Sequence, residues 1–138
     1  MIGPYAHLRT GSKIDDYVKI GNFCEIKNSE IGSYTKISHL AYVGDAKVGS
    51  RVNIGCGVIF VNYNGSQKNK TVVEDNAFIG SNVNLIAPIT IKSGAYVCAG
   101  TTVDLSIDKD DFVIGRVRPE IKKNRAVKYL NKKTDWVL

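Results

Sequence analysis

The chain has 138 residues, of which 43% are hydrophobic, and a formal net charge of +6. This length predicts one domain. No apolar run approaches the roughly 18 residues that a membrane span needs, and the N-terminus lacks the basic-then-apolar pattern of a secretion signal. The sequence therefore predicts a soluble, cytoplasmic protein with no membrane partner.

Aliphatic residues recur at every sixth position from the N-terminus onward. The first run is Leu8, Ile14, Ile20 and Ile26, and the longest is Val73, Ile79, Leu85, Ile91, Val97 and Val103. A period of six fits neither a helix nor a single strand, but it is typical of parallel β-helices, in which each coil turns three corners. A sandwich of alternating strands is the alternative. We predict an all-β chain whose residues 1–106 form a β-helix of five or six coils.

The repeat is interrupted at defined places. It shifts by one residue before Ile31 and again before Val48. Glycine directly follows the inward residue at Gly21, Gly32, Gly44, Gly49, Gly55 and Gly80, where a residue without a Cβ suits a tight corner. Between Phe60 and Val73 the repeat stops, and the polar segment there contains the turn pair Asn64-Gly65. We expect residues 61–72 to protrude as a loop.

Residues 107–138 lack the repeat. We expect a last strand at 112–114, a short helix from Pro119 to about Leu130, and a terminal segment, including Trp136, that is disordered or docked on a partner. From Arg116 onward, eight basic residues face two acidic ones, so this basic tail carries the whole net charge. Such a tail suits cofactor phosphates or simply keeps the protein soluble, whereas nucleic acid is not expected because no aromatic binding motif accompanies the charge.

Cysteine and histidine limit the possible chemistry. Cys24, Cys56 and Cys98 are widely spaced and form no CxxC pair, so we expect neither a disulfide nor a metal. A zinc site with three histidine ligands is excluded because only His7 and His39 exist. His39 is a candidate general base, although a surface histidine is the default interpretation.

Polar residues that suit a phosphorylated sugar lie in the same coils and in the loop. Arginine and lysine bind phosphate, and asparagine or tyrosine orients hydroxyl groups. Taken singly, each of these residues is better explained as part of a solvated face. The set comprises Arg9, Lys27, Asn53, Asn62, Tyr63 and Lys68.

Six strings carry a resemblance to a known family. They are IGPYAHLR (2–9), VKIGNFCEIK (18–27), HLAYVGDA (39–46), VNIG (52–55), NY (62–63) and APIT (87–90). Together they closely resemble the C-terminal domain of the bacterial bifunctional N-acetylglucosamine-1-phosphate uridylyltransferase/glucosamine-1-phosphate N-acetyltransferase. The resemblance covers residues 2–116.

The resemblance implies a left-handed β-helix that assembles as a homotrimer, with acetyl-CoA and glucosamine-1-phosphate bound between subunits and no metal. It implies that His39 is the general base and that Glu25 supports it. Further matches fall into three groups: Arg9, Lys27 and Lys68 for the sugar phosphate; Tyr42, Asn53, Asn62 and Tyr63 for the sugar; Cys56, Ser81, Ala99 and Arg116 along the acetyl-CoA path. Direct acetyl transfer follows, with Cys56 as nucleophile the less favoured alternative because no base accompanies it.

The chain departs from the family at several positions. Val58 and Phe60 replace threonines, Asn64 replaces aspartate, Thr10 replaces proline, and the Gly-Trp pair of the family's tail is missing. The nucleotidyltransferase domain and the first coils are absent too, which suggests an excised fragment or a stand-alone gene. We therefore expect no uridylyl transfer in this chain and a nucleotidyltransferase fused or separate in the source. The alternatives are a catalytically weak trimerisation module and an acyltransferase for a related amino sugar.

Overall fold

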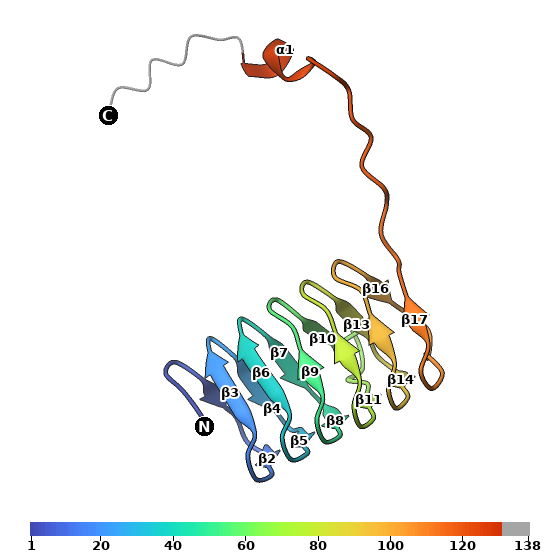
Figure 1. Cartoon of the computed structure of the whole chain (residues 1–138). Coiled ribbons are helices and arrows are strands. Elements are labelled where there is room, and N and C mark those ends of the chain that lie inside the picture. The colour runs from blue at the N-terminus through green and yellow to red at the C-terminus, as the bar shows by residue number, and fades with distance from the viewer. Residues whose placement is uncertain (131–138) are drawn as a thin grey trace, which may run out of the picture.

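The computed structural model describes residues 1–130 and shows a parallel β-helix (Figure 1). Each coil contributes one short strand to each of three faces, and successive coils stack in register. The predicted fold class, a left-handed β-helix of about six coils, is confirmed. No helix among these residues is long and apolar enough to cross a membrane.

The three faces are parallel sheets. The first face contains β1 (His7–Leu8), β4 (Glu25–Lys27), β7 (Tyr42–Gly44), β10 (Ile59–Val61), β13 (Asn84–Ile86) and β16 (Thr102–Val103). The second contains β2 (Lys13–Ile14), β5 (Glu30–Ile31), β8 (Ala46–Val48), β11 (Thr71–Val73) and β14 (Ile89–Ile91). The third contains β3 (Lys19–Asn22), β6 (Lys36–His39), β9 (Asn53–Ile54), β12 (Phe78–Ile79), β15 (Tyr96–Val97) and β17 (Phe112–Val113).

The hexad residues form the core. On the third face, Ile20, Ile37 and Ile54 pair in register and are at most 2% exposed. On this face, equivalent residues in the first three coils are 17 positions apart, because the step from the first face to the second is five residues in the second and third coils. These five-residue steps explain the shifts of the repeat before Ile31 and Val48.

The corners use left-handed backbone conformations. Twelve described residues other than glycine have a positive φ, and all of them except Asn124 lie at corners of the β-helix, several at equivalent positions of successive coils. Asn28 and Asp45, for example, occupy equivalent positions between the first and second faces with φ of 46° and 50°. Asparagine and aspartate tolerate this region better than most residues, because their short side chains can hydrogen-bond locally.

The glycines that follow inward residues have a different role from the one we expected. Gly55 and Gly80 have ordinary φ values, but a Cβ on Gly55 would lie 2.7 Å from the carbonyl carbon of Gly80. A Cβ on Gly80 would in turn lie 2.6 Å from the backbone nitrogen of Ala99. These glycines therefore allow stacked coils to approach closely. The left-handed backbone conformation at the corners is adopted by other residues.

Replacing Gly80 by alanine tests this role. We expect Gly80→Ala to lower the free energy of unfolding by about 1–3 kcal/mol, the usual cost of forcing atoms into a packed interior. The physical reason is that the added methyl group meets backbone of the next coil, which cannot rotate away. Urea unfolding at a fixed protein concentration measures the change. An unaltered midpoint would contradict the close-packing interpretation.

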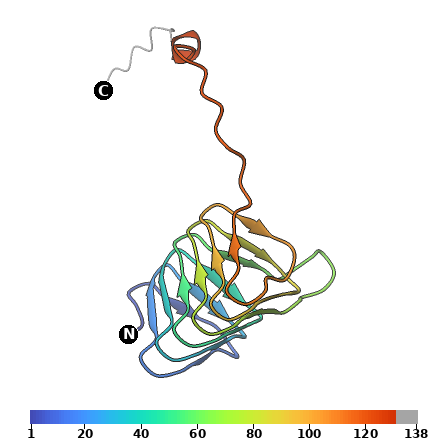
Figure 2. The ribbon, with the colours of Figure 1, turned by 45° about the vertical axis from the view of Figure 1, so that its right-hand side comes forward.

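The predicted loop is present between β10 and β11 and protrudes from the corner between the first and second faces (Figure 2). It returns on itself as a small hairpin, with an antiparallel bridge between Tyr63 and Lys68. The Asn64 side chain accepts hydrogen bonds from the backbone nitrogens of Ser66 and Gln67 at 3.0 and 2.8 Å. The Asn64-Gly65 turn therefore shapes the loop as its sequence indicates.

The C-terminal part differs from expectation in two respects. The β-helix continues beyond residue 106, because Ile107 bridges to Ile91 and β17 pairs with β15. The helix predicted from Pro119 is limited to α1 (Ala126–Leu130), and Asn124 just before it has φ 58°, which a right-handed helix cannot accommodate. None of the residues of α1 is buried. Trp136 lies outside the described residues.

Candidate functional site

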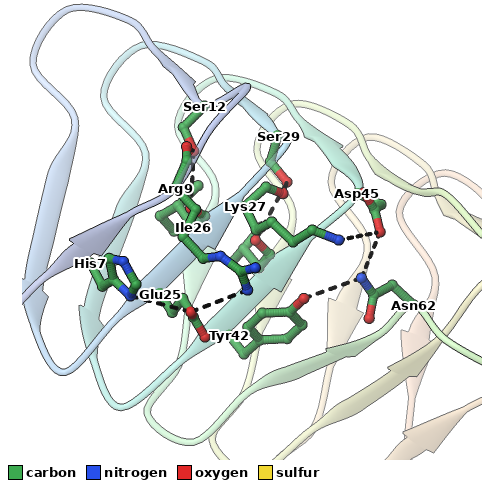
Figure 3. A network of polar contacts seen from close by, with 11 residues as sticks. His7, Arg9, Ser12, Glu25, Ile26, Lys27, Ser29, Tyr42, Asp45 and Asn62 are labelled. Atoms are coloured by element: carbon green, nitrogen blue, oxygen red, sulfur yellow. Dashed lines mark hydrogen bonds and ion pairs between the residues drawn. The ribbon is translucent and has the colours of Figure 1, made fainter. Parts of the chain in front are cut away.

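Charged and polar side chains gather on the outer surface of the first face (Figure 3). At its N-terminal end, a Glu25 carboxylate oxygen lies 3.4 Å from an Arg9 guanidinium nitrogen and 3.3 Å from Nδ1 of His7. These residues come from β4, the segment after β1, and β1 itself, so parallel stacking of two coils brings them together. About half of the Arg9 side chain stays exposed, at 45%.

A second group lies at the adjoining corner, beneath the loop. The Lys27 ammonium is 3.5 Å from an Asp45 carboxylate oxygen, and both side chains are largely buried, at 16% and 12% exposure. Asn62, at the start of the loop, donates hydrogen bonds to Asp45 at 2.6 Å and to the Tyr42 hydroxyl at 3.2 Å. Lys27 from β4 and Asn62 from the loop thus meet on one carboxylate.

The pKa values in this group are shifted by its members. Partial burial acts to raise the pKa of Asp45, but hydrogen bonds from Asn28 and Asn62 and the charge of Lys27 outweigh burial and hold it below its ordinary value. Hydrogen bonding with Lys68 raises the pKa of Lys27, and the charge of Asp45 acts in the same direction. The pKa of Lys68 is lowered, because Lys27 is its hydrogen-bonding partner and like charge. Lys27 and Lys68 therefore influence each other's protonation.

A separate row of residues follows the corner between the third and first faces. His39, Cys56 and Ser81 occupy equivalent positions, because the carbonyl of each accepts a backbone hydrogen bond from the next coil, at 3.4, 2.8 and 2.8 Å. The Ala99 carbonyl continues the series and accepts a 2.8 Å hydrogen bond from the Arg116 guanidinium. We call these residues, His39, Cys56, Ser81, Ala99 and Arg116, the His39 row. Its coils are about 4.8 Å apart, so it forms a straight track along the corner.

Other predicted site residues are not brought together within one chain. Asn53 lies on the third face between Lys36 and Phe78, away from the cluster on the first face. Tyr63 is exposed in the loop and donates a hydrogen bond to the Gly65 carbonyl at 2.7 Å. Glu25 contacts Arg9 and His7, and among the described residues no hydrogen bond or ion pair joins it to His39. Support of His39 by Glu25 stays a prediction.

Three residues that depart from the family pattern do not belong to this site. Val58 and Phe60, which replace threonines, both point into the core and are 0% exposed. Asn64 serves the loop turn through its own side chain. Sequence inspection assigned no role to Asp45, although the equal spacing of Asn28, Asp45 and Asn62, one coil apart, pointed to a common corner.

Side chains that could bind a metal ion do not cluster among the described residues. Within residues 1–130, no three histidine, cysteine, aspartate or glutamate side chains come together in a way that could hold a metal ion. All three cysteines are free, and only Cys56 is not buried.

Comparison with known proteins places these features in a family context. The sequence matches no protein-family model. It is 54% identical over 127 residues to the bifunctional protein GlmU of Acetivibrio thermocellus and 56% identical over 122 residues to that of Caldicellulosiruptor saccharolyticus. Those alignments cover 92% and 88% of this chain but only 28% and 26% of the two relatives, so the chain spans about a quarter of their length.

Solved structures agree on the fold. PerB from Caulobacter crescentus, solved in complex with CoA and GDP-perosamine, superposes with a TM-score of 0.75 at 23% sequence identity and covers 83% of this chain and 53% of that one. At this identity the similarity supports the β-helix fold alone. From the sequence comparison, the chain is a homologue of part of GlmU, consistent with the C-terminal acetyltransferase domain of that bifunctional protein.

Proposed function

We propose that this chain transfers the acetyl group of acetyl-CoA to the amino group of glucosamine-1-phosphate, forming the N-acetylglucosamine-1-phosphate needed for UDP-N-acetylglucosamine and cell-wall precursors. The observation behind the proposal is that the first face carries, along one edge, a cluster that suits a sugar phosphate and, along its other edge, a row that contains a histidine and matches the family's acetyl-CoA path. The bifunctional relatives and the CoA-bound neighbour support it.

The cationic cluster would hold the phosphate. Arg9, Lys27 and Lys68 supply three positive groups, and arginine can bind two phosphate oxygens at once while lysine acts as a point charge. Tyr42 and Asn62 lie next to Lys27 and would orient the sugar hydroxyl groups. The phosphate would thereby fix the distance between the sugar amine and His39.

The His39 row would hold acetyl-CoA in an extended form. Ser81 and Ala99 would contact the pantetheine arm, and Arg116 would lie near the cofactor phosphates. Cys56 takes the place where the family has a small residue close to the thioester. In this arrangement the acetyl group would point toward His39, which lies at the N-terminal end of the His39 row.

The reaction then needs one nucleophilic attack and the loss of two protons from the nitrogen. His39 removes the first proton from the sugar ammonium, and the free amine forms a C–N bond with the thioester carbonyl carbon. Backbone N–H groups at the corner would stabilise the oxyanion. The C–S bond then breaks as the CoA thiolate leaves, and the second proton, which the nitrogen loses on becoming an amide, protonates the thiolate. No covalent enzyme intermediate is required, so Cys56 is not proposed as a nucleophile.

We further propose a homotrimer with active sites between subunits. In one chain, Asn53 lies on a face remote from the Lys27 cluster, so a complete sugar site would draw Asn53 from a neighbouring copy. The exposed stack of Phe78, Tyr96 and Phe112 on that face, with ring centroids 4.4 and 5.1 Å apart, also favours coverage by another subunit. We place the reaction in the cytoplasm, and a nucleotidyltransferase, fused or separate, would carry out uridylyl transfer.

A thiol-release assay tests the function. Purified protein with acetyl-CoA and glucosamine-1-phosphate should release CoA, whereas glucosamine-6-phosphate and unphosphorylated glucosamine should react much more slowly. A well-folded protein that releases no CoA and binds no acetyl-CoA by calorimetry would instead be an assembly module. Preferential reaction with a nucleotide-linked amino sugar would favour the related-amino-sugar alternative.

A further inference from the structure

Asp45 is the common partner of the groups beneath the loop. One carboxylate oxygen accepts a hydrogen bond from the Asn28 amide at 2.9 Å, and the other accepts one from the Asn62 amide at 2.6 Å. The second oxygen also lies 3.5 Å from the Lys27 ammonium. Three donors from the two neighbouring coils thus meet on one carboxylate that is only 12% exposed.

The sign of this charge requires an explanation. A carboxylate next to a phosphate site repels the phosphate, so Asp45 would weaken binding if it acted only through its own charge. Asp45 is also not part of the His39 row, so no step of acetyl transfer needs it. Its contacts indicate a different role, since they restrain two groups, Lys27 and Asn62, that face the proposed substrate.

We propose that Asp45 is a positioning residue for the acceptor phosphate: it holds the Lys27 ammonium and the Asn62 amide in their binding orientation. This inference rests on the proposed function, because it names a residue of the same site. Without the carboxylate, the long Lys27 side chain would sample many rotamers, and ordering it would cost part of the binding free energy.

Electrostatics of the lysine pair supports this role. Like charges repel each other, and the pKa of Lys68 is lowered because of Lys27. Asp45 counteracts this repulsion, since its negative charge acts to raise the pKa of both lysines, whereas Arg9 acts to lower that of Lys68. The carboxylate thereby helps to keep both lysines protonated before the phosphate arrives.

The test is Asp45→Asn in the otherwise intact chain. Asparagine has nearly the same size and suits the left-handed backbone at this corner, so the change removes the charge without straining φ. We expect the KM for glucosamine-1-phosphate to rise roughly 10- to 100-fold, the range for loss of one charge-assisted hydrogen bond. The kcat and the KM for acetyl-CoA should change less than about threefold, because no group of the His39 row is altered.

A pH profile separates positioning from mere corner stability. As pH rises, kcat/KM for glucosamine-1-phosphate should fall when Lys68, which faces Lys27, Asp45 and Arg9, loses its proton. In Asp45→Asn the negative charge that raises the pKa of both lysines is absent, so this alkaline limb should move to lower pH. A purely structural role of Asp45 would leave the position of the limb unchanged.

Two matched variants complete the experiment. Asp110→Asn makes the same change at an exposed corner with φ 61°, and should leave both KM values unaltered. In Lys27→Ala, the further change Asp45→Asn should raise the KM for glucosamine-1-phosphate less than it does in the wild type, because only the contribution through Asn62 and Lys68 is left to lose. If wild-type protein acetylates glucosamine-1-phosphate but Asp45→Asn keeps its KM and pH profile, the inference is wrong. If wild-type protein is inactive, the proposed function itself fails.

Discussion

Replacing His39 by alanine is expected to lower kcat for acetylation of glucosamine-1-phosphate by about 10²- to 10⁴-fold, the usual contribution of a general base. The sugar amine is an ammonium at neutral pH and cannot attack a thioester until it loses a proton. Among the residues of the His39 row, only the imidazole is suited to accept that proton near neutral pH. Removing it leaves proton removal to water.

The same variant should bind its substrates normally. His39 ends β6 at a corner and is exposed, so its loss creates no cavity in the core. We therefore expect KM values and the thermal midpoint to change little, while kcat falls. Steady-state thiol release, with circular dichroism melting as a check of folding, measures both.

His7→Ala is the matched control, because His7 is the second histidine of the chain and lies next to Glu25 on the first face. Its kcat should fall far less than that of His39→Ala. Equal losses in the two variants, or full activity of His39→Ala, would contradict the assignment of the base. An acetylated Cys56 detected by mass spectrometry after incubation with acetyl-CoA alone would instead support the nucleophile alternative.

The hexad pattern was sufficient to predict the fold because every coil repeats the same packing problem. Inward residues such as Ile20, Ile37 and Ile54 stack directly on one another, so the spacing in the sequence equals the geometry of the core. The five-residue step from the first face to the second was also visible in the sequence, as the shift of the repeat before Ile31. The loop was visible as the gap after Phe60.

The site was only partly predictable, because residues of different coils meet at corners. Sequence similarity identified Lys27 and Asn62, but the carboxylate between them was not recognised as their partner. Asp45 contacts residues one coil away on either side, and such contacts follow only from a coil length of 17, which the hexad period of six conceals. The start of the C-terminal helix was missed for a similar reason. It is set by the left-handed backbone of Asn124, which the spacing of apolar residues does not reveal.

The largest stability effect is expected for Phe60→Ala. Phe60 is the largest of the fully buried side chains and pairs in register with Leu85 on the first face. The surrounding coils are tied by backbone hydrogen bonds at every level, so they cannot move inward to fill the space left by the ring. We expect a loss of about 3–5 kcal/mol in the free energy of unfolding, at the upper end of core truncations.

Phe112→Ala separates the effect of burial from that of aromatic content. Phe112 is 64% exposed and contacts Tyr96 through a stack with a centroid distance of 5.1 Å, so its loss should cost at most about 1.5 kcal/mol. Both variants are compared with wild type by urea unfolding at one protomer concentration, because assembly would stabilise the folded chain by mass action.

The shape of the Phe60→Ala transition carries further information. In a solenoid each coil contacts only its neighbours, so a cavity in a central coil weakens the coupling between the coils on either side. We therefore expect a broader transition with a smaller denaturant slope, as the N-terminal coils unfold before the C-terminal ones. A sharp transition that is merely shifted would show that the column unfolds as one unit, whereas equal stability of Phe60→Ala and Phe112→Ala would contradict the central position of Phe60 in the core.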